Sequence, residues 1–282
     1  MKVTQSKIKS CLAAAVAGLV AISCLPSNAQ LLVGLSFPSQ GGGDNDIFTI
    51  DASNPGLILQ SHPLTGLQAS ETLRGIDFWG GTVYGLGSGG NLYSVNYNTG
   101  AATMIGSFGV ALNGASFGVE NEANGFRVVS ELRQNLLVNR ATGVASVGTT
   151  LGSGLFISAL AYSASGTMYG IDSSANSFGT LNTGTGVFTT TGLLGFDVAR
   201  NNGFDIAGNG LAYLASGATS SDVQANLYTV NLATGAATLV GLIGQPGDNT
   251  LVRGLTAVPE PGTVSLVLVG VATLALAIRR RR

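Results

Sequence analysis

Residues 91–109, NLYSVNYNTGAATMIGSFG, recur as residues 226–244, NLYTVNLATGAATLVGLIG, and the two stretches share 12 of 19 residues without a gap. Each copy alternates apolar and polar residues, passes through a Thr-Gly pair and then alternates again. Alternation with a period of two is typical of β-strands, and glycine readily adopts the positive φ that a tight turn requires. Each copy therefore predicts a β-hairpin.

The turn of this hairpin has a counterpart at five places along the chain. It starts at an Asn or Asp and ends at a Gly, and the five starts are Asp51, Asn96, Asn139, Asn182 and Asn231. These starts are 45, 43, 43 and 49 residues apart. A repeat of about 40 to 50 residues is typical of a propeller blade built from four short strands. We interpret the turns as structural connections between the third and fourth strands, at the outer edge of each blade.

Shorter runs before these turns supply the other two strands of four blades. The expected innermost strands are residues 75–78, 116–119, 159–162 and 203–206. The expected second strands are residues 82–86, 126–130, 167–171 and 211–214.

A fifth blade has to be assembled from both ends of the repeat region. Residues 31–36, 46–51 and 57–59 match its outer three strands, and residues 252–258 match the missing innermost strand. Pairing the two ends closes the ring and removes the unpaired sheet edges. The sequence therefore predicts an all-β fold, a five-bladed β-propeller over residues 30–258. A β-sandwich or a β-solenoid is the alternative.

The composition argues against a helical protein and against a nucleic-acid-binding one. The chain has 42 glycines, which disfavour helices, and only 10% charged residues. Between residues 30 and 260 there are six arginines, no lysine and 14 acidic residues, a net charge of −8. Binding to a phosphate backbone needs clustered cations. We therefore expect no nucleic acid as a partner.

The first 29 residues predict a secretory signal peptide. Three lysines give a positive start, residues 11–25 are apolar, and Ser27-Asn28-Ala29 is a small-residue cleavage site, so we expect cleavage after Ala29. The alternative is a lipoprotein acylated on Cys24, although the usual Leu is missing before it. Both cysteines of the chain lie in this segment, so the exported protein would have no disulfide.

The C-terminal end has three parts. Pro259-Glu260-Pro261 leads into an apolar run, residues 263–278, and then into four arginines at 279–282. The run is slightly shorter than the roughly 20 residues of a comfortable transmembrane helix, and the arginines would stay on the cytoplasmic side. A buried or amphipathic C-terminal helix is the alternative, but the run has no polar face.

This three-part end resembles a PEP-CTERM sorting signal, carried by Pro259, Glu260 and Pro261 over residues 259–282. The resemblance implies a Gram-negative-type bacterium in which an exosortase recognises the signal and cleaves near the motif. It also implies transient anchoring in the membrane through residues 263–278, followed by delivery to the cell surface or the extracellular polysaccharide matrix.

The body resembles an uncharacterised bacterial secreted family, a domain of unknown function, over most of residues 31–258. The resemblance is carried by Gly-Ile-Asp-Phe at 75–78, Val-Tyr-Gly-Leu-Gly at 83–87 and the repeat at 92–103. The chain departs from the family at Trp79-Gly80, where Arg-Pro is usual, and at residues 120–124, where an Asp-Arg pair is expected. The family has no assigned activity, so the resemblance supports the fold more than a function.

Two motifs match catalytic or binding patterns only as text, and a lone histidine matches none. Ser116 lies in a G-x-S-x-G string, but a nucleophile elbow needs a strand-to-helix turn and a later histidine, and the sole histidine, His62, comes earlier. Residues 85–90 match G-x-G-x-x-G but lead into a strand, so they predict a hairpin loop without a phosphate site. His62 has no second histidine or cysteine with which to share a metal, and we expect a turn or surface residue.

Asp77 and Asp205 occupy the same position in two expected innermost strands, which line the channel of a propeller. The matching residues of the other blades are expected to be Gly118, Ala161 and Thr256, all small. Two carboxylates meeting in a narrow channel would bind Ca²⁺ or act as an acid/base pair. The alternative is that each accepts backbone hydrogen bonds and holds its strand in place.

Two further features complete the candidate sites. Asp44 and Asp46 flank an Asn in an oxygen-rich stretch that resembles a calcium loop, although a plain polar loop is the alternative. Trp79 directly follows an innermost strand and would offer an aromatic surface to a sugar. We expect a non-catalytic structural, adhesive or glycan-binding protein. The alternative is an extracellular polysaccharide hydrolase or lyase that uses Asp77 and Asp205.

Overall fold

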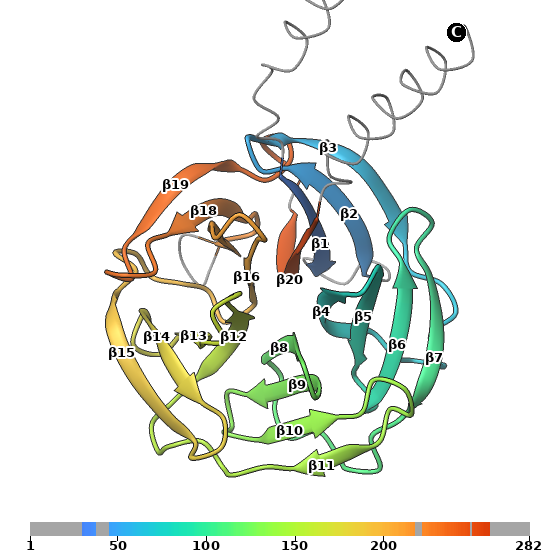
Figure 1. The fold of residues 1–282 in the computed structure, drawn as a ribbon. Helices are drawn as coiled ribbons and strands as arrows, with labels where there is room; N and C mark the ends of the chain where they lie inside the picture. The colour runs from blue at the N-terminus through green and yellow to red at the C-terminus, as the bar shows by residue number, and fades with distance from the viewer. Residues whose placement is uncertain (1–29, 38–44, 218–221, 249, 260–282) are drawn as a thin grey trace, which may run out of the picture.

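The computed structural model describes residues 30–37, 45–217, 222–248 and 250–259. Five antiparallel sheets of four strands each are arranged as blades around a central axis (Figure 1). The predicted all-β, five-bladed β-propeller is therefore confirmed. The described ranges contain no helix, and hence none that is long and apolar enough to cross a membrane. Ala29, Asp44, Glu260, Pro261 and the apolar run 263–278 lie outside the described residues.

Each blade runs from an inner strand beside the axis to an outer strand at the rim. From the axis outward, blade 1 consists of β20 (Leu251–Val258), β1 (Leu31–Phe37), β2 (Asp46–Asp51) and β3 (Asn54–Pro63). Blade 2 consists of β4 (Leu73–Trp79), β5 (Thr82–Gly87), β6 (Asn91–Asn96) and β7 (Ala101–Ser107) in the same order. Blade 3 consists of β8 (Phe117–Glu122), β9 (Gly125–Ser130), β10 (Asn135–Val138) and β11 (Ala145–Val147). Blade 4 consists of β12 (Ile157–Tyr162), β13 (Met168–Asp172), β14 (Ser177–Asn182) and β15 (Val187–Leu193). Blade 5 consists of β16 (Asn202–Ile206), β17 (Ala212–Ser216), β18 (Asn226–Val230) and β19 (Ala237–Leu242).

The two ends of the body share blade 1, as the sequence predicts. β1 pairs antiparallel with β20, from Leu31 opposite Val258 to Phe37 opposite Leu251. The side-chain amide of Gln30 also donates a hydrogen bond of 2.9 Å to the carbonyl oxygen of Val258. The first described strand is thereby tied to the last, and the ring is closed.

Four of the five repeated turns have one geometry. Asn96, Asn139, Asn182 and Asn231 each accept a hydrogen bond from the backbone N–H two residues later, at 2.9 to 3.0 Å. The glycine that ends each turn has a φ between 72° and 76°. A side chain there would be strained. The turns join the outer two strands of their blades, so the structure confirms their predicted structural role.

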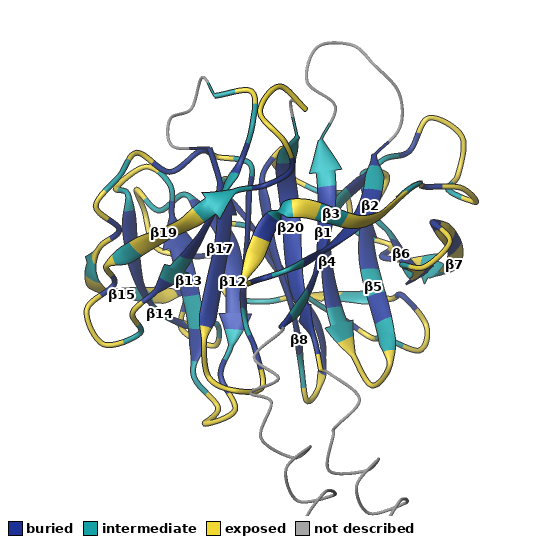
Figure 2. Cartoon of the chain, turned by 90° about the horizontal axis from the view of Figure 1, so that it is seen from above, coloured by how far each residue is buried: buried dark blue, intermediate teal, exposed yellow. Residues whose placement is uncertain are grey.

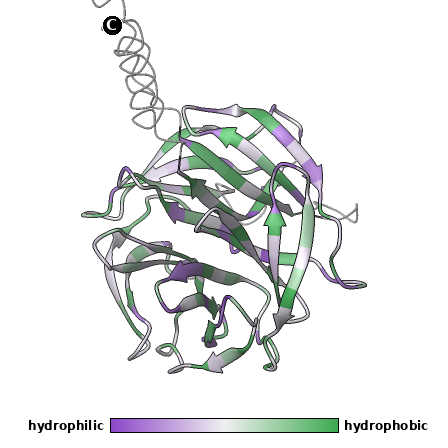
Figure 3. Cartoon of the chain, turned by 45° about the vertical axis from the view of Figure 1, so that its right-hand side comes forward, coloured by the Kyte–Doolittle hydropathy of each residue, from purple (hydrophilic) through white to green (hydrophobic). Residues whose placement is uncertain are grey.

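The hydrophobic core lies between neighbouring blades. The rings of Tyr84 in blade 2 and Phe126 in blade 3 are 6.4 Å apart, and those of Phe178 in blade 4 and Phe204 in blade 5 are 5.9 Å apart. Figure 2 shows that the inner strands are almost wholly buried, whereas outer strands such as β15 and β19 contain only intermediate and exposed residues. Hydrophobic segments recur along the strands around the ring (Figure 3).

One inner strand lies two residues away from its predicted position. We expected residues 116–119 to form it, with Gly118 matching Asp77. In the structure Glu120 pairs with Arg127 in blade 3 in the same way as Asp77 pairs with Tyr84 in blade 2, so Glu120 is the true counterpart. Side chains alternate with a period of two, and a shift of two residues therefore preserves the hydrophobic pattern that guided the alignment.

Candidate binding site at one mouth of the channel

The five inner strands run in the same direction, so their C-terminal ends surround one mouth of the central channel. A pocket of about 360 Å³ lies there. Its acidic residues, Asp77, Glu120 and Asp205, are 3 to 7% exposed and come from blades 2, 3 and 5. Trp79, half-buried Tyr162 and Pro259 also line the pocket. The channel mouth is therefore a hollow with deeply buried carboxyl groups.

The channel is closed beneath these carboxyl groups. We call the inner-strand position of Asp77, Glu120 and Asp205 the acidic position; Ala161 and Thr256 occupy it in the other two blades. Two residues before it, the inner strands come very close together at Gly75, Gly118, Gly203 and Gly254. A Cβ added to Gly203 would lie 2.3 Å from the backbone nitrogen of Leu255, and one added to Gly75 would lie 2.8 Å from Val119. The remaining space at this level is about 10 Å³, enough for no more than one water molecule. The pocket is therefore blind.

Side chains at the acidic position hold neighbouring inner strands together. Asp77 Oδ2 accepts hydrogen bonds from the backbone N–H and the side-chain amide of Asn121, at 2.6 and 3.0 Å. Asp205 Oδ2 accepts the N–H of Ala257 at 2.6 Å, and Thr256 Oγ1 accepts the N–H of Phe78 at 3.0 Å. These contacts correspond to the structural alternative for Asp77 and Asp205: each accepts a backbone hydrogen bond from the next blade.

Blade 4 breaks this pattern because Ala161 occupies the acidic position and has no side-chain acceptor. The backbone N–H of Ile206, on the next inner strand, instead donates to Asp205 Oδ1 at 2.6 Å. Asp205 therefore accepts hydrogen bonds on both of its oxygens, from its own strand and from β20.

The three carboxyl groups converge closely. One oxygen from each of Asp77, Glu120 and Asp205 lies within 4.8 Å of the other two. Burial, together with the charge of Asp205, raises the pKa of Asp77 to about 7. Burial and the charges of Asp77 and Asp205 raise the pKa of Glu120 well above its usual range. Burial also raises the pKa of Asp205, although hydrogen bonds from Ala257, Thr256 and Ile206 lower it.

The hydroxyl group of Thr256 shows that the cluster requires a proton or a cation. Thr256 Oγ1 lies 2.9 Å from Asp77 Oδ1 and 3.0 Å from Asp205 Oδ2. A hydroxyl has one hydrogen to donate, and it cannot satisfy two ionised carboxylates at once. Either one of these carboxyl groups carries a proton, or a positive ion lies close to both.

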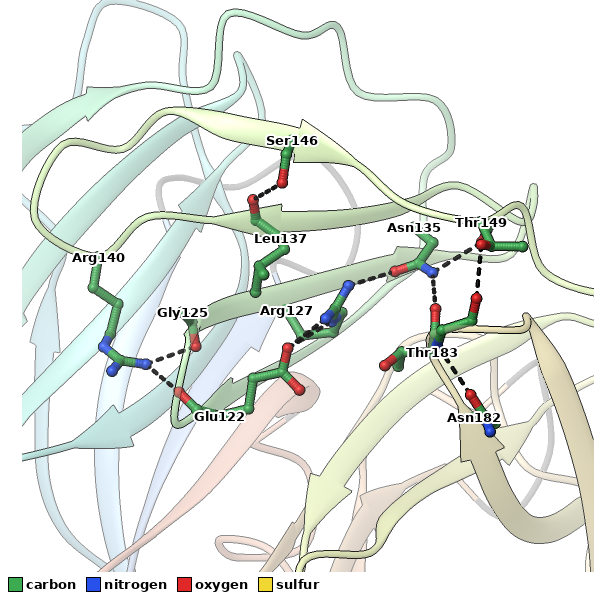
Figure 4. Close-up of polar contacts among 11 residues, drawn as sticks. Glu122, Gly125, Arg127, Asn135, Leu137, Arg140, Ser146, Thr149, Asn182 and Thr183 are labelled. Atoms are coloured by element: carbon green, nitrogen blue, oxygen red, sulfur yellow. Dashed lines mark hydrogen bonds and ion pairs between the residues drawn. The ribbon is translucent and has the colours of Figure 1, made fainter.

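Arg127, the arginine nearest in register to the acidic position, does not supply this charge. It stands where three other blades have tyrosines, Tyr84, Tyr169 and Tyr213. Its guanidinium forms an ion pair with Glu122 and donates to Asn135 Oδ1 at 2.9 Å (Figure 4). Asn135 in turn donates to the carbonyl oxygen of Thr183 and links blades 3 and 4. None of the described residues that line the pocket is Lys or Arg.

The side chain of Trp79 forms a fixed aromatic surface at the pocket. It is 41% exposed, and the guanidinium carbon of Arg140 lies 4.6 Å from its ring centre. Arg140 is held in turn by hydrogen bonds to the backbone carbonyl oxygens of Glu122 and Gly125 (Figure 4). The ring is therefore packed against a cation whose own position is fixed by the β8–β9 turn.

A second hollow of about 570 Å³ adjoins this pocket. Tyr162 lines both, and so Tyr162 lies between them. Many of the other lining residues carry hydroxyl or amide groups, among them Thr167, Thr180, Asn182 and Thr189. Together the two hollows extend from the channel mouth across blade 4.

The remaining candidates from the sequence lie elsewhere. Ser116 precedes β8 and donates its backbone N–H to Glu131. His62 is half-buried on β3, opposite Ile47. Asp46 accepts a hydrogen bond from Ser61 at 3.2 Å, and its expected partner Asp44 is outside the described residues.

The glycine-rich loop at residues 85–90 is part of the β5–β6 hairpin, as predicted. It surrounds the carboxylate of Glu71, which accepts hydrogen bonds from the N–H of Gly89 and the side chains of Asn91 and Tyr93. A Cβ on Gly87 would lie 2.2 Å from Glu71 Oε1. Glycine is needed at this position for close approach to a carboxylate of the same blade.

Glu120 is the main site residue that the sequence analysis missed. A usable signal was present, because Gly118-Val-Glu-Asn121 matches Gly75-Ile-Asp-Phe78 and Gly203-Phe-Asp-Ile206 in its glycine and its acid. The hydrophobic alternation did not reveal the error, because both frames satisfy it.

Comparison with known proteins identifies two regions of the chain. Residues 46–256 match a domain of unknown function, DUF4394, and residues 257–282 match the PEP-CTERM protein-sorting motif. Both resemblances seen in the sequence are thereby confirmed. Among curated proteins, none matches the chain.

Solved structures share the architecture at low sequence identity. A chain of a nidogen/laminin complex is 13% identical, with 82% of this chain and 99% of that chain covered and a TM-score of 0.50. A protein of unknown function from Bacteroides thetaiotaomicron is 15% identical, with 82% of this chain and 65% of that chain covered and a TM-score of 0.50. A further one, from Bacteroides caccae, is 12% identical, with 82% and 100% covered and a TM-score of 0.49. At these identities the likeness concerns the fold alone.

Proposed function

We propose, from the premise that this chain belongs to the DUF4394 family and carries a PEP-CTERM sorting motif, that it is a non-catalytic glycan-binding protein. The motif implies export, transient membrane anchoring and recognition by an exosortase. The proposed ligand is extracellular polysaccharide at the cell surface or in the surrounding matrix, and the proposed site is the pocket at the channel mouth.

The observation that carries this proposal is the fixed ring of Trp79 beside a pocket with buried carboxyl groups. The apolar face of a sugar ring packs well on an exposed aromatic side chain, and sugar hydroxyl groups donate to carboxylate oxygens. A ring held by Arg140 loses little conformational entropy when it binds, and this favours affinity. The pocket volume of about 360 Å³ is within the usual range for small-ligand sites.

The adjoining hollow favours a polymer over a single sugar. It shares Tyr162 with the pocket, so a chain of sugars entering at Trp79 would extend past Tyr162 over blade 4. Threonine hydroxyls and the amide of Asn182 offer both donors and acceptors along this path.

The spacing of the carboxyl groups argues against glycoside hydrolysis. The two carboxyl groups of retaining enzymes are about 5 to 5.5 Å apart, and those of inverting enzymes about 6.5 to 9.5 Å. One oxygen of each of Asp77, Glu120 and Asp205 lies within 4.8 Å of the other two, which is closer than the room an inverting enzyme needs for its water. Asp77 and Asp205 are also occupied by backbone hydrogen bonds, which leaves little freedom for an acid and a base on opposite sides of a bond.

Substitution of Trp79 tests the proposal. Binding of a polysaccharide panel by Trp79→Ala should be at least about 10-fold weaker than that of the unsubstituted protein, because the stacking surface is lost. Trp79→Phe should retain most of the affinity. Calorimetry or surface plasmon resonance would measure both.

Phe156→Ala is the matched control. Phe156 precedes β12 at the opposite end of the inner strands, and Arg200 lies 5.5 Å above its ring. Its substitution should leave polysaccharide binding unchanged. Equal binding by Trp79→Ala would contradict the proposed site. Polysaccharide turnover that Asp77→Asn abolishes would contradict the non-catalytic role.

A further inference from the structure

We propose that Asp77, Glu120 and Asp205 bind one Ca²⁺ ion in the pocket at the channel mouth. The three residues come from three blades, each is more than nine-tenths buried, and one oxygen of each lies within 4.8 Å of the other two. This site lies in the same pocket as the proposed glycan site, but metal binding and glycan binding are measured separately.

Unpartnered oxygens are the second observation that indicates a ligand. Among the described residues, the buried Oε2 of Glu120 and the buried Oδ1 of Asn121 have no hydrogen-bond partner. An unsatisfied buried acceptor costs free energy, and a carboxylate costs more than a neutral group. A cation coordinated by Glu120 Oε2 would remove this cost.

Three other carboxylates, those of Glu71, Glu131 and Asp172, accept several hydrogen bonds each. Glu71 accepts three hydrogen bonds from its own blade, and Glu131 accepts the backbone N–H groups of Ala115 and Ser116. Asp172 accepts hydrogen bonds from the backbone and hydroxyl groups of Ser174. Glu120 accepts a hydrogen bond from the backbone of Tyr162, but its buried Oε2 has no partner among the described residues.

The donor chemistry favours Ca²⁺. All three ligands are oxygens, which favours a hard cation over a transition metal. One oxygen of each residue lies within 4.8 Å of the other two, so all three can contact one ion. Ca²⁺ accepts several protein oxygens in a flexible geometry, whereas Mg²⁺ demands a nearly ideal octahedron and usually keeps several waters.

The charges also favour a cation. Three carboxylates meet where no described lining residue is Lys or Arg, and Thr256 cannot donate to both Asp77 and Asp205. A divalent cation would offset most of this negative charge without protons. It would also connect the inner strands of blades 2, 3 and 5, and should therefore stabilise the closed ring.

Calcium titration of the full-length chain in detergent, after removal of metals with a chelator, tests the site. We expect one equivalent of Ca²⁺ to bind in calorimetry. Binding should raise the melting temperature by about 5 to 10 °C when free Ca²⁺ is about 100 times its dissociation constant. Mg²⁺ should bind at least about 10-fold more weakly.

Two variants distinguish a calcium-binding site from a cluster whose carboxyl groups are neutralised by protons alone. Glu120→Gln should lower the Ca²⁺ affinity at least about 10-fold, because affinity depends on the number of charged ligands. Its melting temperature in chelator should equal or exceed that of the unsubstituted protein, since it removes a buried charge. Asp46→Asn, which changes a carboxylate at the other candidate loop, should bind Ca²⁺ normally.

Three outcomes would overturn the proposal. These are the absence of a binding heat at millimolar Ca²⁺, a melting temperature that Ca²⁺ does not change, and unaltered affinity in Glu120→Gln. Loss of binding in Asp46→Asn with normal binding in Glu120→Gln would assign the ion to the other loop. Because the readout is the metal itself, failure of the calcium test leaves the Trp79 experiment unaffected.

Discussion

At the scale of single residues, Thr256 has the most demanding role at the channel mouth. Its hydroxyl accepts the backbone N–H of Phe78 and contacts both Asp77 and Asp205. It is fully buried, so water cannot replace any of these contacts. The residue joins three inner strands through one oxygen atom.

Thr256→Val should therefore destabilise the protein strongly despite its nearly unchanged shape. The substitution removes the acceptor of the Phe78 N–H and the hydroxyl contact of the Asp77 and Asp205 carboxyl groups, and each buried group left unsatisfied costs about 1 to 3 kcal/mol. We expect a loss of about 2 to 4 kcal/mol in the free energy of unfolding, measured by urea denaturation. Thr103→Val, on exposed outer strand β7, should change it by less than about 0.5 kcal/mol. Equal effects of the two would contradict this role.

At the scale of strands, the inner strands approach one another through glycine. Gly203 of β16 packs against the backbone of Gly254 and Leu255 in β20, and Gly75 of β4 packs against Val119 of β8. A channel this narrow is what brings the three carboxyl groups to within 4.8 Å. The glycines and the acids that follow them by two residues are therefore one structural device, repeated in several blades.

Gly203→Ala should test this close packing. Its Cβ would lie 2.3 Å from the backbone nitrogen of Leu255, and backbone cannot move aside as a flexible side chain can. We expect a loss of about 3 kcal/mol or more, in the upper part of the range for overpacking. Gly208→Ala is the matched control, because nothing lies within 4 Å of its added Cβ. Thermal and urea unfolding of both variants would measure the difference. Equal stability would contradict the close packing at Gly203.

The strand predictions succeeded where a local pattern determines structure, and failed where two patterns competed. The hairpins around Asn96 and Asn231 follow from alternation and from a glycine at the turn, both of which are visible in the sequence. The inner strand of blade 3 was misplaced by two residues, because the frames beginning at Ser116 and at Gly118 have the same alternation. The glycine and the acid of residues 118–121 indicate the correct frame, and the pairing of Glu120 with Arg127 establishes it.

At the scale of the whole molecule, the closed ring places both described ends of the chain beside the pocket. Gln30 binds the carbonyl oxygen of Val258, and Pro259, the first residue of the sorting motif, lines the pocket. The sorting motif therefore begins at the mouth of the channel.

The buried tyrosines of the ring predict how stability depends on pH. Burial raises the pKa of Tyr93, Tyr213 and Tyr228, and for Tyr93 the hydrogen bond to Glu71 adds to the effect. Above a pH of about 10 the unfolded chain loses these protons while the folded protein keeps them. The unfolded state is then favoured, so the free energy of unfolding should fall as the pH rises above about 10.

Tyrosinate absorbance measured together with thermal melting would check this prediction. Part of the tyrosine signal should appear only when the alkaline protein unfolds. Tyr93→Phe should reduce that delayed fraction. Ionisation of all tyrosines in the folded state, with no fall in melting temperature, would contradict the prediction.

The sequence by itself determined the number of blades, the position of the turns and the closure of the ring by its two ends. These features depend on a repeat period and on short-range alternation, which a single chain displays directly. The convergence of Asp77, Glu120 and Asp205, the stacking of Arg140 on Trp79 and the blind pocket were decided only by the tertiary structure. Their distances depend on how tightly five separate strands pack around one axis, and a local pattern such as a glycine followed by an acid does not specify those distances.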